Sequence, residues 1–161
     1  MKSNQTLKGF TLVELIVVIA IIGVLAAILV PSMLGYVTKA KLSAVNSSAK
    51  TLYNAASVAC READVEHPVP EGIYSKDTSQ GANFDSTLCT HIYEYFPKLS
   101  GAEWAIQIQA DSVVSTCIQR KSGDGYVGTF PVPNTVKDAH TNGGVIDFSS
   151  ALQAGLEGTG D

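Results

Sequence analysis

The sequence predicts an α+β fold in which a long N-terminal helical spine packs on a small head domain with an antiparallel sheet. Two observations carry this prediction. Apolar residues fill positions 10–30 almost without interruption, and apolar positions then recur every three or four residues as far as position 63, which is typical of one continuous helix. Residues 104–120 then alternate in polarity or are rich in β-branched side chains, which is typical of paired strands.

The first half of the spine, residues 10–33, has the length and composition of a membrane span. Its apolar run covers roughly 30 Å, the thickness of the hydrocarbon core of a bilayer. A helix is expected there because every backbone amide in lipid needs a partner within its own segment. Glu14 is the exception in composition. A carboxylate near the membrane centre costs about 2.5 to 3.5 kcal/mol, so Glu14 is a candidate functional residue that needs a partner.

A short motif lies in front of and across the start of this run. It follows a leader with Lys2 and reads Lys8-Gly9-Phe10-Thr11-Leu12-Val13-Glu14. The string resembles the prepilin signal of type IV pilins and the related pseudopilins, which covers about the first third of the chain. The resemblance implies a pilin-like fold, removal of residues 1–9 by a membrane peptidase that cuts after Gly9, and methylation of the new amino terminus at Phe10.

The resemblance also implies how subunits assemble. Glu14 matches the acid of the family, which meets the amino group exposed at Phe10 of a neighbouring subunit. Within a single helix, Glu14 can instead approach its own positive helix end. A secretory signal peptide does not fit, because its apolar core is shorter and its small-residue cleavage site follows that core. A generic signal anchor fits the length but gives no reason for the acid.

Two residues interrupt the predicted spine. Pro31, which matches a helix proline of the family, lacks an amide hydrogen, so we expect a kink or local melting between residues 23 and 31. The kink either serves assembly or is passive. Gly23 either allows neighbouring helices to approach closely or only weakens its own helix.

The second half of the spine, residues 34–63, is apolar on one side only. This half is therefore expected to underlie the head, whereas the first half packs among copies of itself. Its opposite side is basic, through Lys39, Lys41, Lys50 and Arg61. These side chains form either a solvated face or a contact with the acidic head of an adjacent subunit.

The head, residues 64–161, is expected to begin with a surface loop over residues 66–83, which are rich in proline, glycine and polar residues. Short helices are expected over residues 85–96 and 149–156, followed by a frayed tail. The candidate caps are Asp85 or Ser86 for the first helix and Ser149 or Ser150 for the second. The apolar side of the first helix, expected in the core, consists of Leu88, Ile92, Tyr95 and Phe96.

The strands of the head are expected to be antiparallel. Residues 104–110 and 113–120 should form a hairpin that turns at Asp111 and Ser112. Residues 126–131 form a third strand, whose prolines suit a sheet edge or a strand end. A short strand is expected over residues 145–148, after the turn residues that precede it.

The charge distribution excludes nucleic-acid binding as an expected function. Residues 64–161 include thirteen acidic and only five basic residues, whereas affinity for nucleic acid depends on basic side chains. The positive leader before the apolar run predicts a single-pass precursor with residues 1–8 in the cytoplasm and the head outside.

Export makes the cysteines candidates for a disulfide. Cys60, Cys89 and Cys117 allow one internal bridge, in any of three pairings, and buried free thiols are the equal alternative. Cys89 and His91 are too few for a metal site. Calcium could be bound by Asp124, Asp138 and Asp147, as the resemblance to some pseudopilins suggests. However, Asp and Gly are common in turns because they suit the backbone conformation there, so we expect no metal.

No catalytic arrangement is present: the sequence has no phosphate-binding loop, nucleophile elbow or helix with paired histidines. His67, His91 and His140 are expected at the surface or partly packed. We therefore expect neither an enzyme nor a cofactor. The predicted function is that of a structural subunit of a type IV pilus filament. The alternatives are a pseudopilin of a type II secretion or DNA-uptake system and a membrane-anchored binding module that does not polymerise.

The resemblance implies several partners for a filament subunit. They are other copies of the chain in a helical filament, the prepilin peptidase and methyltransferase, the inner-membrane assembly platform with its ATPase, and lipid before assembly. It likewise implies a location that changes from the cell membrane to an extracellular filament.

Overall fold

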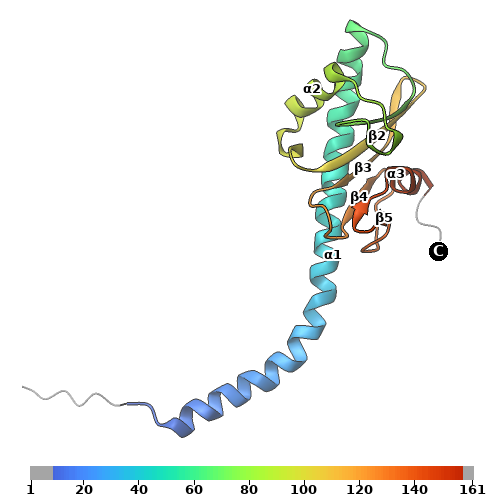
Figure 1. The fold of residues 1–161 in the computed structure, drawn as a ribbon. Coiled ribbons are helices and arrows are strands. Elements are labelled where there is room, and N and C mark those ends of the chain that lie inside the picture. The colour runs from blue at the N-terminus through green and yellow to red at the C-terminus, as the bar shows by residue number, and fades with distance from the viewer. Residues whose placement is uncertain (1–8, 158–161) are drawn as a thin grey trace, which may run out of the picture. The chain divides into compact units, whose positions relative to one another are not determined.

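A computed structural model describes residues 9–157 of the chain (Figure 1). Expectations about the leader charges and the last four residues lie outside this range. The chain divides into two compact units between Val37 and Thr38. The α+β prediction is confirmed, because a long helix packs on a small antiparallel sheet within the second unit.

The first unit consists of the beginning of helix α1, which spans Leu12–Glu66. The helix starts two residues later than predicted and ends three residues later. It is continuous through Gly23 and Pro31, so of the two predicted alternatives, a kink or local melting, the local melting is wrong. Pro31 removes one backbone donor, but the turns on both sides of it are retained. Among the described residues, α1 is the one helix that is long and apolar enough to cross a membrane.

The head sheet has four antiparallel strands in the order β1-β2-β3-β4. The strands are β1 (Gly72–Ser75), β2 (Glu103–Gln109), β3 (Ser112–Gln119) and β4 (Val127–Phe130). The predicted hairpin of β2 and β3 is confirmed, but its turn lies one residue earlier than predicted because Ser112 already belongs to β3. Strand β4 is an edge strand. Ala110 and Asp111 turn the hairpin with φ of 47° and 57°, the positive values that a tight hairpin turn requires.

Strand β1 corrects the expectation that residues 66–83 form only a surface loop. Gly72 pairs with Ile108 and Ser75 pairs with Ala105, and the side chains of Tyr74 and Ser75 are buried. Four residues are too few to show a period in sequence. The strand exists because it pairs with β2, a partner far away along the chain.

The sheet is covered on both faces (Figure 1). The second half of α1 and helix α2 (Ser86–Tyr95) pack on one face, and helix α3 (Phe148–Glu157) packs on the other. Successive strand residues serve opposite faces. The core on the α1 face includes Leu52, Ala56, Leu88, Ile92, Trp104, Ile106 and Ile118. The core on the α3 face includes Ala105, Cys117, Val127, Ile146, Phe148 and Leu152.

Close contact between α1 and β4 depends on one glycine and one asparagine. A Cβ atom on Gly128 would overlap the carbonyl group of Val45 and lie 2.8 Å from the amide nitrogen of Asn46. The side chain of Asn46 accepts hydrogen bonds from the amides of Thr129, at 3.1 Å, and Asn134, at 3.2 Å. It also donates to the carbonyl of Asn134, at 2.7 Å. Asn46 therefore ties α1 to β4 and to the loop that follows β4.

The helix caps are partly as predicted. Asp85 caps α2 by accepting a hydrogen bond from the Leu88 amide at 2.9 Å. Helix α3 begins at Phe148, and the capping side chain is Asp147, which accepts from the Ser150 amide at 3.1 Å. The expectation of Ser149 or Ser150 as the cap is wrong, because the helix already begins at Phe148 and the carboxylate of Asp147 accepts from a first-turn amide.

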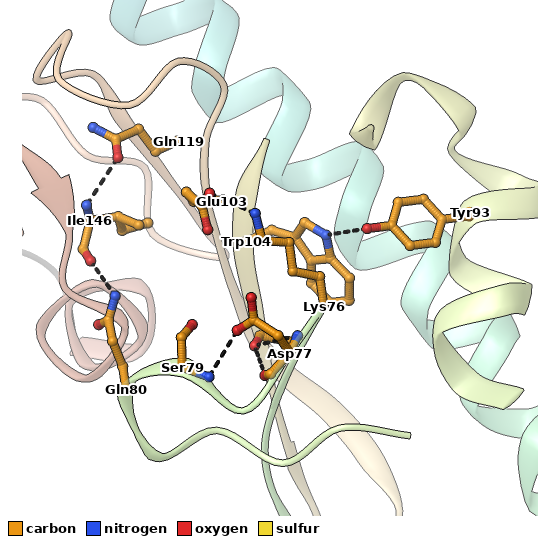
Figure 2. Close-up of polar contacts among 10 residues, drawn as sticks. Lys76, Asp77, Ser79, Gln80, Tyr93, Glu103, Trp104, Gln119 and Ile146 are labelled. Atoms are coloured by element: carbon orange, nitrogen blue, oxygen red, sulfur yellow. Dashed lines mark hydrogen bonds and ion pairs between the residues drawn. The ribbon is translucent and has the colours of Figure 1, made fainter. Parts of the chain in front are cut away.

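The predicted strand at residues 145–148 is shorter than expected. Strand β6 covers Val145–Ile146 and pairs with β5 (Thr141–Asn142). Figure 2 shows how two glutamines hold Ile146: the Gln119 side chain accepts from its amide at 2.9 Å, and the Gln80 side chain donates to its carbonyl at 2.7 Å. Side-chain amides thus replace the backbone partners that a longer strand would have.

One member of the expected α2 core is misplaced. Leu88 and Ile92 are buried and Phe96 packs against the core, but Tyr95 is 46% exposed. Its hydroxyl donates to the Glu62 carboxylate on α1 at 2.6 Å. The apolar stripe of α2 is therefore narrower than predicted.

Candidate assembly surface

The first unit presents an apolar helix with no cover of its own. Every residue from 10 to 37 is exposed, including Phe10 at 92% and Leu12 at 72%. A folded chain in water does not keep an apolar surface of this length uncovered. Lipid or other protein must therefore cover the helix.

Glu14 lies at the start of this surface and is bound to its own helix end. Its carboxylate accepts hydrogen bonds from the amide of Thr11 at 2.8 Å and from the Thr11 hydroxyl at 2.7 Å. The Thr11 hydroxyl lies 3.3 Å from the Glu14 amide, which donates to it. This reciprocal pattern is a capping box. Within one subunit, Glu14 therefore has the local role that the sequence left open.

The proposed processing site lies just before α1. Gly9 and Phe10 are exposed and precede the first helical residue, Leu12. The bond between them is therefore free of helical hydrogen bonds. This placement suits a bond that a peptidase must reach, because protease cleavage requires an extended, accessible backbone.

Gly23 and Pro31 face open space within the single chain. A Cβ atom at Gly23 would have no atom within 4 Å, so nothing in its own subunit requires a glycine there. Ser32, beside Pro31, donates its hydroxyl hydrogen to the Leu29 carbonyl at 2.8 Å. The roles of both positions in assembly stay predictions.

A groove of about 550 Å³ lies along the head between α1 and the chain after β4. Its apolar lining comes from Leu42, Phe130, Pro131 and Pro133. Lys39 and Lys50 are the charged residues that line it, and no acidic residue does so in the described part of the chain. We call this feature the lysine groove.

The end of α1 is acidic. Glu62 and Glu94 each have a carboxylate oxygen near Nδ1 of His91, at 3.4 and 3.9 Å, and Glu66 lies 3.8 Å from its Nε2. His67 bonds to Asp85 at 2.7 Å. The hydrogen bond to Asp85 raises the pKa of His67 above its ordinary value.

The three cysteines are free and buried. Burial raises the pKa of Cys60 and of Cys89 to about 11 and that of Cys117 to about 12. The thiolate is the reactive form, and burial disfavours it at all three positions. Their packing is that of small apolar residues, which is one of the two alternatives that the sequence allowed.

The three aspartates considered for calcium serve separate turns. Asp124 accepts from the Tyr126 amide at 3.0 Å, Asp147 caps α3, and Asp138 lies 3.3 Å from Lys137. Within residues 9–157, no group of three or more His, Cys, Asp or Glu side chains is arranged to hold a metal ion.

Comparison with known proteins agrees with this geometry. The prokaryotic N-terminal methylation motif matches residues 7–30, the segment that contains Gly9, Phe10 and Glu14. The start of the chain is therefore similar to the start of type IV pilins. The chain is 44% identical over 52 residues to the type IV major pilin protein PilA of Myxococcus xanthus, a match that covers 32% of this chain and 24% of that protein.

Two further relatives match over a longer segment. The type IV major pilin protein PilE of Neisseria gonorrhoeae is 36% identical over 86 residues, 53% of this chain and 47% of the relative. A fimbrial protein of Pseudomonas aeruginosa is 38% identical over 82 residues, 50% and 51% of the two chains. The chain thus spans at most about half the length of the relatives described. None of their names is that of an enzyme, and no solved structure matches significantly.

Two features of this chain were not predicted from its sequence. The first is the role of Thr11 as the partner of Glu14. The sequence does contain its signal, because a threonine three residues before a glutamate has the spacing of a capping box. The lysine groove had no such signal, because residues 39–50 and 129–135 form it together.

Proposed function

We propose that this chain is the structural subunit of a type IV pilus filament. The precursor is cut after Gly9, methylated at Phe10, held in the membrane by the first half of α1, and then polymerised through that helix. The partners are other copies of the chain, the prepilin peptidase and methyltransferase, and the membrane assembly platform with its ATPase. The head lies outside the membrane and then on the cell surface.

The observation that carries the proposal is one acid on an apolar helix that its own chain leaves uncovered. Apolar contacts between helices resemble one another along the axis, so they do not set the register of neighbouring subunits. A buried charge does set the register, because it is stabilised only where it lies beside a charge of opposite sign. Cleavage supplies that partner as the amino group of Phe10 in another copy, and the new ion pair replaces the local bonds of Glu14 to Thr11.

Three variants separate the charge of Glu14 from its capping role. Glu14→Leu removes both, Glu14→Gln keeps a capping side chain without the charge, and Thr11→Ala removes the capping hydroxyl but keeps the charge. We expect all three to be inserted and cut. We expect Thr11→Ala alone to form filaments that electron microscopy detects. Assembly of Glu14→Gln at the wild-type level would contradict the register mechanism.

The intact mass of the mature protein tests processing. A chain that begins at Phe10 and carries one additional methyl group is expected. A full-length mass, or a chain cut elsewhere, would contradict the cleavage proposal independently of assembly.

The relatives favour a pilus over a secretion pseudopilus, since those described are named as major pilins or as a fimbrial protein. The distinction is testable by deleting the gene and measuring surface fibres and protein secretion. Loss of secretion with no surface fibres in the parent cell would assign the pseudopilus function instead.

A further inference from the structure

The lysine groove carries two positive charges that the subunit does not use. Within residues 9–157, neither Lys39 nor Lys50 forms an ion pair. Lys41, between them, is engaged, because its ammonium group lies 5.0 Å from the centre of the Tyr126 ring. The head is otherwise strongly acidic, so the absence of an acid beside these two lysines is a local property of the groove.

The end of α1 has the complementary composition. Val65 is 87% exposed, the highest value for a large apolar residue of the head. Asp64 and Glu66 flank it in sequence and are exposed. Among the described residues, neither acid forms an ion pair with a lysine or an arginine. The helix end is thus an apolar tip between two carboxylates.

We propose that the lysine groove of one copy receives the Val65 tip of another copy. Val65 enters the apolar lining near Leu42 and Phe130, and Asp64 and Glu66 meet Lys39 and Lys50. The partner is a second copy of this chain. The inference rests on the proposed filament and adds a specific contact between heads to the packing of the N-terminal helices.

The positions of the two surfaces determine the kind of assembly. The α1 wall of the groove and the Val65 tip both lie in the second unit, Thr38–Asp161. Along α1, Asn46 at the centre of the groove is separated from Val65 by about 28 Å at 1.5 Å per residue. A contact between different surfaces of identical subunits is heterologous, and it generates an open array unless its rotation closes a ring. Contacting heads are therefore offset by about 28 Å along α1.

Charge reversal tests the contact. The pair Lys39→Glu with Lys50→Glu places like charges at the contact, and we expect roughly tenfold fewer filaments. The pair Asp64→Lys with Glu66→Lys is expected to have the same effect. Combining all four changes restores opposite charges and is expected to restore most filaments. Lys121→Glu is the matched control, because Lys121 is exposed and lies outside the groove.

Cross-linking tests the geometry without changing these charges. Ser43 is exposed and lines the groove. Chains with both Ser43→Cys and Val65→Cys should form ladders of disulfide-linked copies under mild oxidation, whereas mixed single variants should form dimers only. Absence of linked species in assembled filaments would overturn the contact, as would wild-type filament yield from the reversed lysine pair.

The outcomes distinguish this inference from the proposed function. If Glu14→Leu abolishes filaments while the charge-reversed variants assemble normally, the pilus function stands and the head contact is wrong. If the wild-type chain forms no filaments, both proposals fall. Cutting and methylation should be unchanged in every charge variant, because the substitutions lie far from Gly9 in the sequence.

Discussion

Replacing Gly128 with alanine should separate β4 from α1. The added Cβ would overlap the carbonyl group of Val45, and backbone atoms on both sides cannot rotate away as a flexible side chain would. Ordinary contact requires the two segments to move apart by about 1 Å. Such overpacking costs about 1 to 3 kcal/mol, and the displacement also stretches the 3.1 Å hydrogen bond from Thr129 to Asn46, worth about 1 kcal/mol.

The expected loss in free energy of unfolding is therefore about 3 kcal/mol, or about 10 °C in Tm for a domain of this size. Trp104 is the single tryptophan of the chain and is fully buried in the head, so its fluorescence reports unfolding of the full chain in detergent. Gly35→Ala is the control, because an added Cβ there meets no atom within 4 Å. A Gly128→Ala variant that unfolds within about 2 °C of wild type would refute the reasoning.

Three further predictions follow from single groups. The bond to Asp85 raises the pKa of His67 in the folded chain. Protonated His67 therefore stabilises the fold fully below its unfolded pKa of about 6.5, and this stabilisation is lost as the pH rises through the folded pKa. Tm should fall over that pH range in wild type and less in His67→Gln. All three cysteines should resist iodoacetamide at pH 8 in the folded chain and should react with it in urea without reductant. If two cysteines stay unreactive in urea, they form a disulfide. Gly23→Ala should leave processing unchanged, since the site is open in the subunit, but should lower filament yield; normal yield would show that neighbouring helices do not approach there.

Much of the fold could be predicted because its signals are local. The period of α1, the capping position of Asp85 and the strand pattern across residues 104–120 each lie within a few neighbouring residues. Strand β1 could not be predicted in this way, since the pairing of Gly72 with Ile108 makes it a strand. The cap of α3 was misplaced by a few residues because Asp147 and the serines after it are all good capping residues.

The candidate assembly surface likewise has a part that could be predicted from the sequence and a part that could not. Gly9, Phe10 and Glu14 form a contiguous motif, so the sequence contains the whole of it. The lysine groove requires the chain after β4 to return to α1, and only the three-dimensional arrangement shows which lysines lack a partner. The exposed position of Tyr95 likewise depends on where Glu62 lies on another helix.

The contacts of Asn46 have a further consequence for the energetics of association. By binding Thr129 and Asn134 within the isolated subunit, this side chain orders one wall of the lysine groove before any partner arrives. A preorganised wall avoids the entropy loss of ordering a loop on binding, about 0.5 to 1.5 kcal/mol for each immobilised flexible side chain. An exposed contact with only a few ion pairs can then stabilise the association of copies, because the entropy loss of ordering this wall already occurred when the head folded.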